Sequence, residues 1–180
     1  RGRWKLSESE QTPSLRSERT RLRRARKKGL YDRNSLYTLL DDFPLCHVAY
    51  IESGVPYATP TLQWRESNRV YWHGSSKSRA VLSAAGQTVC LTVTRLDGLV
   101  LARSGFEHTV NHASAMIFGT PFLIKDPEQK RAHLKHMFDH LYPGRWEQLR
   151  PMSDGELKAT AIIGMDITEA SVKIRSGPSD

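Results

Sequence analysis

Apolar and polar side chains alternate in short runs along the middle of the chain. Residues 45–51, 57–64 and 69–72 are rich in β-branched and aromatic side chains, and polar turns with glycine or asparagine separate them. This pattern is typical of antiparallel strands that follow one another in a meander. It predicts three consecutive strands in this part of the sequence.

The same kind of run recurs towards the C-terminus. Further strands are expected at residues 88–94, 99–103, 115–124, 160–167 and 170–174. Asp97 and Gly98 predict a tight turn between the first two of these strands. Many short strands with only small helices between them favour a closed or nearly closed antiparallel barrel. The predicted fold class is therefore mainly β, a β-barrel with a few short helices.

The clearest helix signal lies in the last third of the chain. Asp126 and Pro127 are suited to the N-cap and the first turn of a helix, and Pro143 with Gly144 ends the segment. At helical spacing, four apolar side chains form one stripe that is expected to face the barrel: Leu134, Met137, Phe138 and Leu141. A shorter helix is expected to begin at Ser35, which is a suitable N-cap.

Three histidines lie on one flank of the long helix, and their spacing has two interpretations. His133, His136 and His140 fall within a narrow arc of a helical wheel. The spacing suits a metal site, but no cysteine and no well-placed carboxylate completes it. We therefore favour a solvated helix flank, and no metal site is predicted.

Positive charge is concentrated at the start of the chain. The formal net charge is +8, and residues 1–33 hold twelve Lys or Arg against four Asp or Glu, whereas residues 34–180 hold fifteen of each. We expect a basic, disordered arm over residues 1–30, followed by one domain over residues 31–180. The positive net charge of the protein therefore comes from the arm, and the net charge of the domain is close to zero.

The basic run at residues 19–28 has two interpretations. Its charge suits binding to nucleic acid or to an anionic membrane surface. However, the run contains no interleaved aromatic side chains for base stacking. We therefore favour a solvated arm that packs on the domain or on a partner subunit, and neither a nucleic acid nor a membrane is a predicted partner.

Several features favour a cytoplasmic protein. The sequence contains no run of eighteen apolar residues and no apolar signal-peptide core near its start. Cys46 and Cys90 lie in apolar, strand-like runs, which favours buried free thiols over a disulfide. Free thiols are typical of a reducing compartment, so the cytoplasm is the expected location.

The most informative stretch is residues 70–82, VYWHGSSKSRAVL. It begins with the composition of a strand, continues through a glycine turn, and ends with the composition of a short helix. Ser75 or Ser76 is expected to cap that helix. A helix start with free N–H groups, hydroxyls and the cations Lys77 and Arg79 suits a phosphate dianion. The alternative is an exposed polar turn without a ligand.

Eight pieces of the sequence stand in an order and spacing that resemble a known superfamily. They are CHVAYI (46–51), PYATPTLQW (56–64), VYWHGSSKSR (70–79), VCLTVTRLDGLVLARS (89–104), FEHTVNHASAMIFG (106–119), PGRW (143–146), ELKAT (156–160) and EASVKIRSGP (169–178). Their arrangement resembles the flavin mononucleotide (FMN)-binding split-barrel superfamily that includes pyridoxamine 5′-phosphate oxidase, and above all its flavin-nucleotide-binding and nitroimidazole-resistance-like branch. The resemblance implies an FMN-binding split β-barrel that forms a homodimer with flavin at the subunit interface.

The resemblance distributes the flavin contacts over three groups of residues. Phosphate contacts are expected from Ser75, Ser76, Lys77, Ser78 and Arg79. Hydroxyls for the ribityl chain are expected from Thr92 and Thr94. The strand that runs along the flavin ring in the family corresponds to Thr59, Pro60, Thr61 and Leu62. A proline within a strand also marks a strand edge, where free backbone groups remain for a ligand.

His73, Asn111 and Ser114 complete the predicted site. His73 stands where the nitroimidazole-resistance-like branch places a histidine near the flavin ring, so it is the candidate catalytic residue beside a small-molecule substrate. The alternative is a half-buried histidine bonded to a neighbouring carbonyl group. Asn111 and Ser114 match the ends of the family's Asn-Tyr-Arg-Ser, whereas His112 and Ala113 replace its Tyr and Arg.

The resemblance leaves two main classes of function open. The first is an FMN-dependent oxidoreductase that passes electrons from a reduced nicotinamide or a similar donor to a small organic acceptor, such as a nitro compound or a quinone. The second is a non-enzymatic module that stores, carries or senses flavin. Nucleic-acid binding through the basic arm is a third and weaker alternative. The substrate-phosphate cluster of pyridoxamine 5′-phosphate oxidase is not found in residues 173–180, and fold alone does not transfer that activity.

Overall fold

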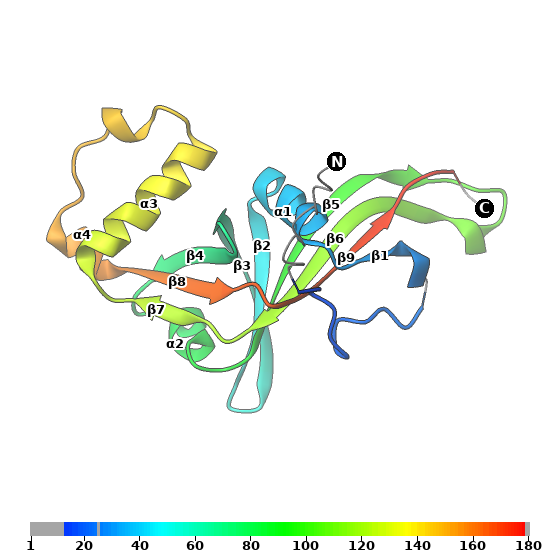
Figure 1. Cartoon of the computed structure of the whole chain (residues 1–180), viewed down its shortest axis with the longest axis horizontal. Coiled ribbons are helices and arrows are strands. Elements are labelled where there is room, and N and C mark those ends of the chain that lie inside the picture. The colour runs from blue at the N-terminus through cyan, green and yellow to red at the C-terminus, as the bar shows by residue number, and fades with distance from the viewer. Residues whose placement is uncertain (1–12, 25, 179–180) are drawn as a thin grey trace, which may run out of the picture.

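The computed structural model of the chain describes residues 13–24 and 26–178, and these form one antiparallel sheet with helices packed on it (Figure 1). The strands are β1 Gly29–Leu30, β2 Leu45–Glu52, β3 Val55–Glu66, β4 Arg69–Ser75, β5 Val89–Val100, β6 Thr109–Gly119, β7 Phe122–Ile124, β8 Thr160–Asp166 and β9 Glu169–Arg175. Their order in the sheet is β1-β9-β6-β5-β2-β3-β4-β8-β7. The mainly β fold class is therefore confirmed. No pairing between described residues joins the edge strands β1 and β7, so the sheet stays open where a barrel would close.

The predicted meander of β2, β3 and β4 is confirmed, and β3 divides its pairing between its two neighbours. Residues 55–62 of β3 pair with β2, where Pro60 stands opposite His47, and residues 63–66 pair with β4. Among the described pairings, the second edge of residues 55–62 has no partner strand. Pro60 has no N–H to donate to a ladder, so it suits a strand with one free edge.

The tight turn expected at Asp97 and Gly98 is wrong. β5 runs through both residues, and its pairing with β6 shifts register between Leu96 and Gly98. The shift is a β-bulge, in which an extra residue stays outside the ladder while the strand continues. The carboxylate of Asp97 is satisfied locally, because it pairs with Arg95 at 2.6 Å.

Residues 115–124 form two strands instead of the single strand predicted. Thr120 and Pro121 stand between β6 and β7, and a proline cannot donate to a ladder. β6 pairs with β9, whereas β7 pairs with β8. The chain therefore crosses here from the side of the sheet that contains β9 to the side that contains β8.

The capping signals in the sequence predict the start of the long helix correctly, but they misplace the N-caps of the two shorter predicted helices. The helical elements are α1 Arg33–Asp42, α2 Arg79–Ala84, α3 Pro127–Leu141 and α4 Asp154–Ala159, with 3-10 turns η1 Arg26–Lys28, η2 Gly105–Glu107 and η3 Trp146–Gln148. Asp126 caps α3 as predicted, since its carboxylate accepts a hydrogen bond from the N–H of Gln129 at 2.9 Å. Asp32 replaces the expected Ser35 as the N-cap of α1, and the N–H of Ser35 donates to it at 2.8 Å. No helix in the described part of the chain is long and apolar enough to span a membrane.

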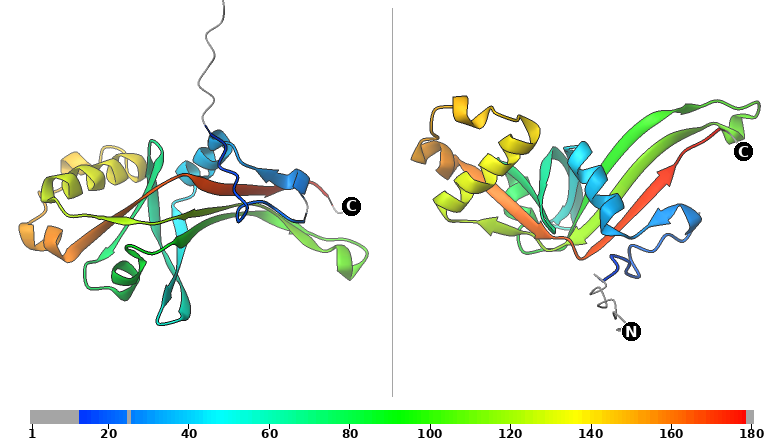
Figure 2. Two further views of the ribbon diagram at one scale, coloured as in Figure 1. Left: turned by 60° about the horizontal axis from the view of Figure 1, so that its bottom comes forward. Right: turned by 45° about the horizontal axis from the view of Figure 1, so that its top comes forward.

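The buried apolar side chains form two clusters. The larger cluster joins α1 and α2 to the strands β2, β4, β5, β6, β8 and β9. The smaller cluster lies beneath α3 and consists of Trp64, Tyr71, Leu134, Met137, Leu157 and Ile162. Phe138 and Leu141 pack against its margin, so the predicted apolar stripe of α3 is confirmed. Figure 2 shows that α3 and α4 lie at one end of the elongated molecule, while the β5–β6 hairpin extends from the other end.

Part of the expected arm packs on the domain. Leu15 is buried, its N–H donates to the carbonyl oxygen of Tyr31 at 3.2 Å, and its own carbonyl oxygen accepts from the N–H of Ala170 at 2.9 Å. Arg19 pairs with Glu169 at 2.8 Å. The expected disorder does not extend to these residues, and residues 1–12 of the predicted arm lie outside the described residues.

Both cysteines are free thiols, as predicted, although they differ in burial. Cys46 is fully buried and Cys90 is partly buried. Burial raises the pKa of the Cys46 thiol to about 12, and it also raises the pKa of Cys90. Both groups therefore remain protonated and weakly nucleophilic at neutral pH.

Candidate functional site

The strand-to-helix segment between β4 and α2 differs from the prediction in its cap. β4 continues through Ser75, because this residue pairs with Thr160 of β8. The N-cap of α2 is Ser78, whose Oγ accepts a hydrogen bond from the N–H of Val81 at 3.2 Å. The expectation that Ser75 or Ser76 caps the helix is therefore wrong, since the sheet holds the chain extended for longer than the local sequence indicates.

A cavity of about 240 Å³, here called the small cavity, lies beside β3, β4 and α2. Six of the predicted site residues line it: Thr59, Pro60, Thr61, His73, Ser75 and Ser78. The half of β3 with a free edge forms one wall, and there the Thr61 hydroxyl donates to the carbonyl oxygen of His73 at 3.3 Å. Ligand pockets usually exceed about 300 Å³, so the small cavity lies slightly below the usual size.

The two predicted phosphate-binding cations lie outside the small cavity. Lys77 is exposed, and its backbone N–H donates to Ser75 Oγ at 3.3 Å. Arg79 pairs with Glu52 at 3.3 Å, and its guanidinium carbon lies 4.4 Å from the centre of the Tyr57 ring. The predicted residues that do not line the small cavity are Leu62, Ser76, Lys77, Arg79, Thr92, Thr94, Asn111 and Ser114.

Four of these residues belong to β5 and β6. Thr94 stands directly opposite Ser114, and Thr92 lies two residues before Thr94 on the same strand. Asn111 Oδ1 accepts a hydrogen bond from the Arg175 guanidinium at 2.6 Å. Arg175 therefore supplies a cation beside the stretch in which the family's arginine is missing. Sequence reasoning missed it, because the two partners are 64 residues apart.

A larger cavity of about 510 Å³, here called the large cavity, lies between β4 and α3, and the sequence analysis did not identify it. Its walls are mainly apolar and include Leu134, Met137, Phe138, Trp146, Leu149 and Met152. The apolar stripe of α3 was a signal for part of this wall. The remainder comes from the segment between α3 and α4, which has no helical or strand periodicity in the sequence.

His73 lines both cavities. Its ring lies 6.2 Å from the ring of Trp64, on the face of the sheet that carries α3. Nδ1 of His73 is buried and has no hydrogen-bond partner among the described residues, so this nitrogen does not make the carbonyl contact of the alternative interpretation. Burial lowers the pKa of His73 below its ordinary value, which keeps the imidazole neutral at physiological pH. A neutral imidazole with an unpaired nitrogen is suited to bind a metal ion or a polar group of a ligand.

The prediction of a solvated histidine flank on α3 is wrong for His133. Its Nδ1 lies 3.0 Å from both carboxylate oxygens of Glu66, and its ring centre lies 4.4 Å from that of Tyr71. These contacts attach α3 to the sheet. Among the residues that the structure describes, no group of three His, Cys, Asp or Glu side chains is arranged to hold a metal ion.

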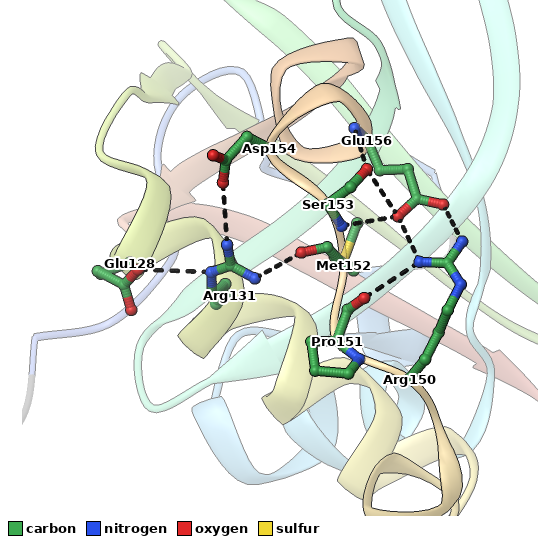
Figure 3. A network of polar contacts seen from close by, with 8 residues as sticks. All are labelled: Glu128, Arg131, Arg150, Pro151, Met152, Ser153, Asp154 and Glu156. Carbon is green, nitrogen blue, oxygen red and sulfur yellow. Dashed lines mark hydrogen bonds and ion pairs between the residues drawn. The ribbon is translucent and has the colours of Figure 1, made fainter.

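Two arginines stand at the edge of the large cavity, and Figure 3 shows the network around them. Arg131 lies 3.4 Å from Glu128 and 3.4 Å from Asp154. Arg150 makes a two-pronged ion pair with Glu156, at 2.9 and 2.5 Å. The described residues that line the cavity include no Asp or Glu. The charged groups of the lining are therefore two guanidinium groups, each paired with carboxylates that lie outside the lining.

The sequence profile of the pyridoxamine 5′-phosphate oxidase family matches residues 32–174, a span that contains both cavities. The chain belongs to this family. A search of curated protein sequences finds no match.

Solved structures of other family members confirm the split-barrel superfamily that the sequence predicted. The flavocytochrome Anf3 from Azotobacter vinelandii is 44% identical over 91% of this chain and 77% of that chain, with a TM-score of 0.88. The FAD and heme binding protein from Mycobacterium smegmatis is 36% identical over 85% of this chain and 76% of that chain, with a TM-score of 0.80. A Bacteroides thetaiotaomicron protein, provisionally described as a 5-nitroimidazole antibiotic resistance protein, is 20% identical over 81% of this chain and 86% of that chain, with a TM-score of 0.67. This last likeness concerns the fold alone.

Proposed function

We propose that this protein binds a flavin nucleotide and transfers electrons through it. The observation that carries the proposal is the convergence of six predicted residues on the small cavity, beside the free edge of β3. The description of a 44% identical relative as a flavocytochrome supports the same class of function. FMN is the nucleotide expected from the sequence. FAD has the same ring, ribityl chain and first phosphate, so the same residues serve either nucleotide.

Each part of a flavin has groups of matching chemistry in or near the small cavity. The free backbone edge at residues 59–62 offers hydrogen-bond donors and acceptors to the ring system. The hydroxyls of Ser75 and Ser78 are offered to the phosphate. Lys77 makes no ion pair with a described residue, so its ammonium group is available to a phosphate, whereas Glu52 holds Arg79. A bound flavin supplies hydride transfer and one-electron transfer.

We also propose a homodimer in which a second copy completes the flavin site. The small cavity of one chain is below the usual size of a ligand pocket, and four of the predicted contacts lie elsewhere, on β5 and β6. The β5–β6 hairpin exposes large apolar side chains, which favour a protein partner: Leu96, Leu99, Leu101 and Phe106, each 64% to 95% exposed. Sedimentation equilibrium should give twice the mass of the chain.

We propose that the large cavity holds a heme with His73 as an iron ligand. The residues present fit this group, because the volume of about 510 Å³ and the apolar walls suit a drug-sized or larger ring. The neutral imidazole of His73, whose Nδ1 has no hydrogen-bond partner among the described residues, would have the chemistry of a ligand to heme iron. A 36% identical relative is described as binding FAD and heme. A bound heme supplies one-electron chemistry and oxygen chemistry.

The activity that follows is that of an oxidoreductase. We propose that a reduced nicotinamide or a similar donor provides the electrons and that a small organic molecule accepts them. The free thiols of Cys46 and Cys90 agree with a reducing compartment such as the cytoplasm. The alternative is a protein that stores or senses flavin without turnover.

The absorption spectrum of the purified protein, after reconstitution with FMN or FAD, tests the proposal. Flavin bands that bleach when a reduced nicotinamide is added without oxygen support the oxidoreductase. Flavin bands that persist under the same conditions favour the storage or sensing role. The absence of binding by either nucleotide would overturn the flavin proposal. Mass spectrometry of the nucleotide that copurifies with the protein, before reconstitution, distinguishes FMN from FAD.

The heme proposal has a separate test. Hemin added to the protein should give the absorption spectrum of a histidine-ligated heme, and His73→Ala should lose this spectrum. Circular dichroism and the melting temperature of the same variant report whether the fold is intact. A histidine-ligated spectrum that survives in His73→Ala would remove His73 as the ligand.

A further inference from the structure

The large cavity combines apolar walls with two guanidinium groups. Arg131 and Arg150 are the charged residues among those described as lining it, while His73 is kept neutral by burial. Two guanidinium groups form no charge-assisted hydrogen bonds with a neutral apolar molecule. An apolar molecule that carries carboxylates, in contrast, forms charge-assisted hydrogen bonds with both.

Arg131 is held in place from two sides (Figure 3). One of its nitrogens lies 3.4 Å from Glu128, and a second lies 3.4 Å from Asp154. The third donates a hydrogen bond to the carbonyl oxygen of Met152 at 2.9 Å. A guanidinium group has five N–H donors. Since these contacts with described residues use three of them, two donors are left for a ligand.

Arg150 is held by the first turn of α4. Glu156 accepts two of its N–H groups at 2.9 and 2.5 Å, and the carbonyl oxygen of Pro151 accepts one at 3.1 Å. Glu156 is fixed in turn by the capping box of α4, in which the N–H of Ser153 donates to it at 2.8 Å. Two donors of Arg150 therefore also remain. Because both arginines are ordered before a ligand arrives, less side-chain freedom is lost on binding.

We infer that Arg131 and Arg150 bind the carboxylates of the molecule in the large cavity and select a dicarboxylic ring over its neutral counterpart. The inference rests on the proposed heme function, because the two propionates of heme are the carboxylates concerned. Glu128, Asp154 and Glu156 do not line the cavity. They hold the two arginines in place, and the remaining N–H donors are left for the ligand. One charged hydrogen bond corresponds to about a tenfold to hundredfold change in affinity, which is the effect expected for each arginine.

Binding titrations test the inference by combining arginine variants of the protein with a ligand whose carboxylates are neutralised. Hemin and hemin dimethyl ester, in which both propionates are neutral, are titrated into wild-type protein, Arg131→Gln, Arg150→Gln and the double variant. The absorption band of the bound ring gives each dissociation constant. We expect each single variant to bind hemin about tenfold to hundredfold more weakly than wild type. The ester should bind to all four proteins with one common affinity, weaker than that of hemin for wild type.

The matched control is Arg145→Gln, because Arg145 is exposed, bonds to Gln148 and does not line the large cavity. This variant should bind both ligands as wild type does. An equal loss for hemin and ester in the Arg131 and Arg150 variants would assign the arginines to packing and overturn the inference. Equal affinities of wild type for hemin and its ester would also overturn it, and that comparison needs no variant. Failure of wild type to bind either ligand would instead overturn the heme proposal.

Discussion

The indole N–H of Trp64 donates a hydrogen bond of 2.8 Å to the carboxylate of Glu66. Trp64 is buried beneath α3, and the same carboxylate lies 3.0 Å from Nδ1 of His133 on that helix. Glu66 therefore satisfies a buried donor of the sheet and ties α3 to it. Because α3 forms one wall of the large cavity, this contact also positions the cavity.

Glu66→Ala should destabilise the protein, because it leaves the buried Trp64 N–H without an acceptor. An unsatisfied buried donor costs about 1 to 3 kcal/mol of folding free energy, and urea unfolding followed by tryptophan fluorescence measures it. Glu107→Ala is the control, since Glu107 is exposed in η2. Equal unfolding midpoints for the two variants would contradict the prediction.

Gly164→Ala should also destabilise the protein, by overpacking. A Cβ atom at this position would lie 2.8 Å from ring atoms of Phe122 and of Tyr71, and neither ring is a flexible side-chain end. Overpacking of a core typically costs about 1 to 3 kcal/mol. Gly98→Ala is the matched control, because a Cβ there has no heavy atom within 4 Å. Thermal unfolding should separate the two variants, and a wild-type melting temperature for Gly164→Ala would contradict the expected clash.

Cys46 should resist alkylation in the folded protein. Burial raises the pKa of its thiol to about 12, so very little of the reactive thiolate is present at neutral pH. Burial also keeps the alkylating reagent away from the sulfur atom. Iodoacetamide labelling followed by peptide mass spectrometry should detect modified Cys46 only after urea is added. Rapid labelling of Cys46 in the absence of urea would show that the strand opens locally.

The contribution of Glu156 to stability should depend on pH. A side-chain hydrogen bond from Arg150, with others from Ser153, lowers the pKa of Glu156 from its ordinary 4.5 to about 2. A lowered carboxyl pKa stabilises the folded state above the unfolded value and ceases to do so as the pH falls through the folded value. The melting temperature of Glu156→Gln should therefore lie below that of wild type above pH 4.5 and approach it towards pH 2. A difference that does not change across this range would contradict the assignment.

Lys77→Ala should weaken flavin binding. The loss of one charged hydrogen bond corresponds to about 1.5 to 3 kcal/mol, or roughly a tenfold to hundredfold change in the dissociation constant. Quenching of flavin fluorescence measures this constant, and Lys158→Ala, an exposed position on α4, is the control. An unchanged constant in Lys77→Ala would remove Lys77 from the phosphate site.

Features that depend on neighbouring residues could be predicted from the sequence. The alternation in β2 and β3 predicts strands because successive side chains point to opposite faces. Asp126 and Pro127 predict the start of α3 because capping is satisfied within one turn. The resemblance to the family added what periodicity cannot provide, namely that Thr61 and Ser75, which belong to different strands, line one small cavity.

Features that depend on distant partners could not be predicted in this way. Asp97 and Gly98 have the composition of a tight turn, but the long ladder with β6 turns them into a bulge. Ser75 has the composition of a helix cap, but its pairing with Thr160 keeps it in a strand. In both places a pairing partner far along the chain outweighs the local preference.

The sequence by itself determined most of the strands, the long helix and six of the residues that line the small cavity. Only the tertiary structure decided that His73 from β4, Arg131 from α3 and Arg150 from the segment before α4 surround one large cavity. The physical reason is that local spacing sets which side of one element a residue occupies, whereas the lining of a cavity depends on how separate elements pack together. No spacing rule along the chain connects those three residues, so their common site emerged only when the elements were in place.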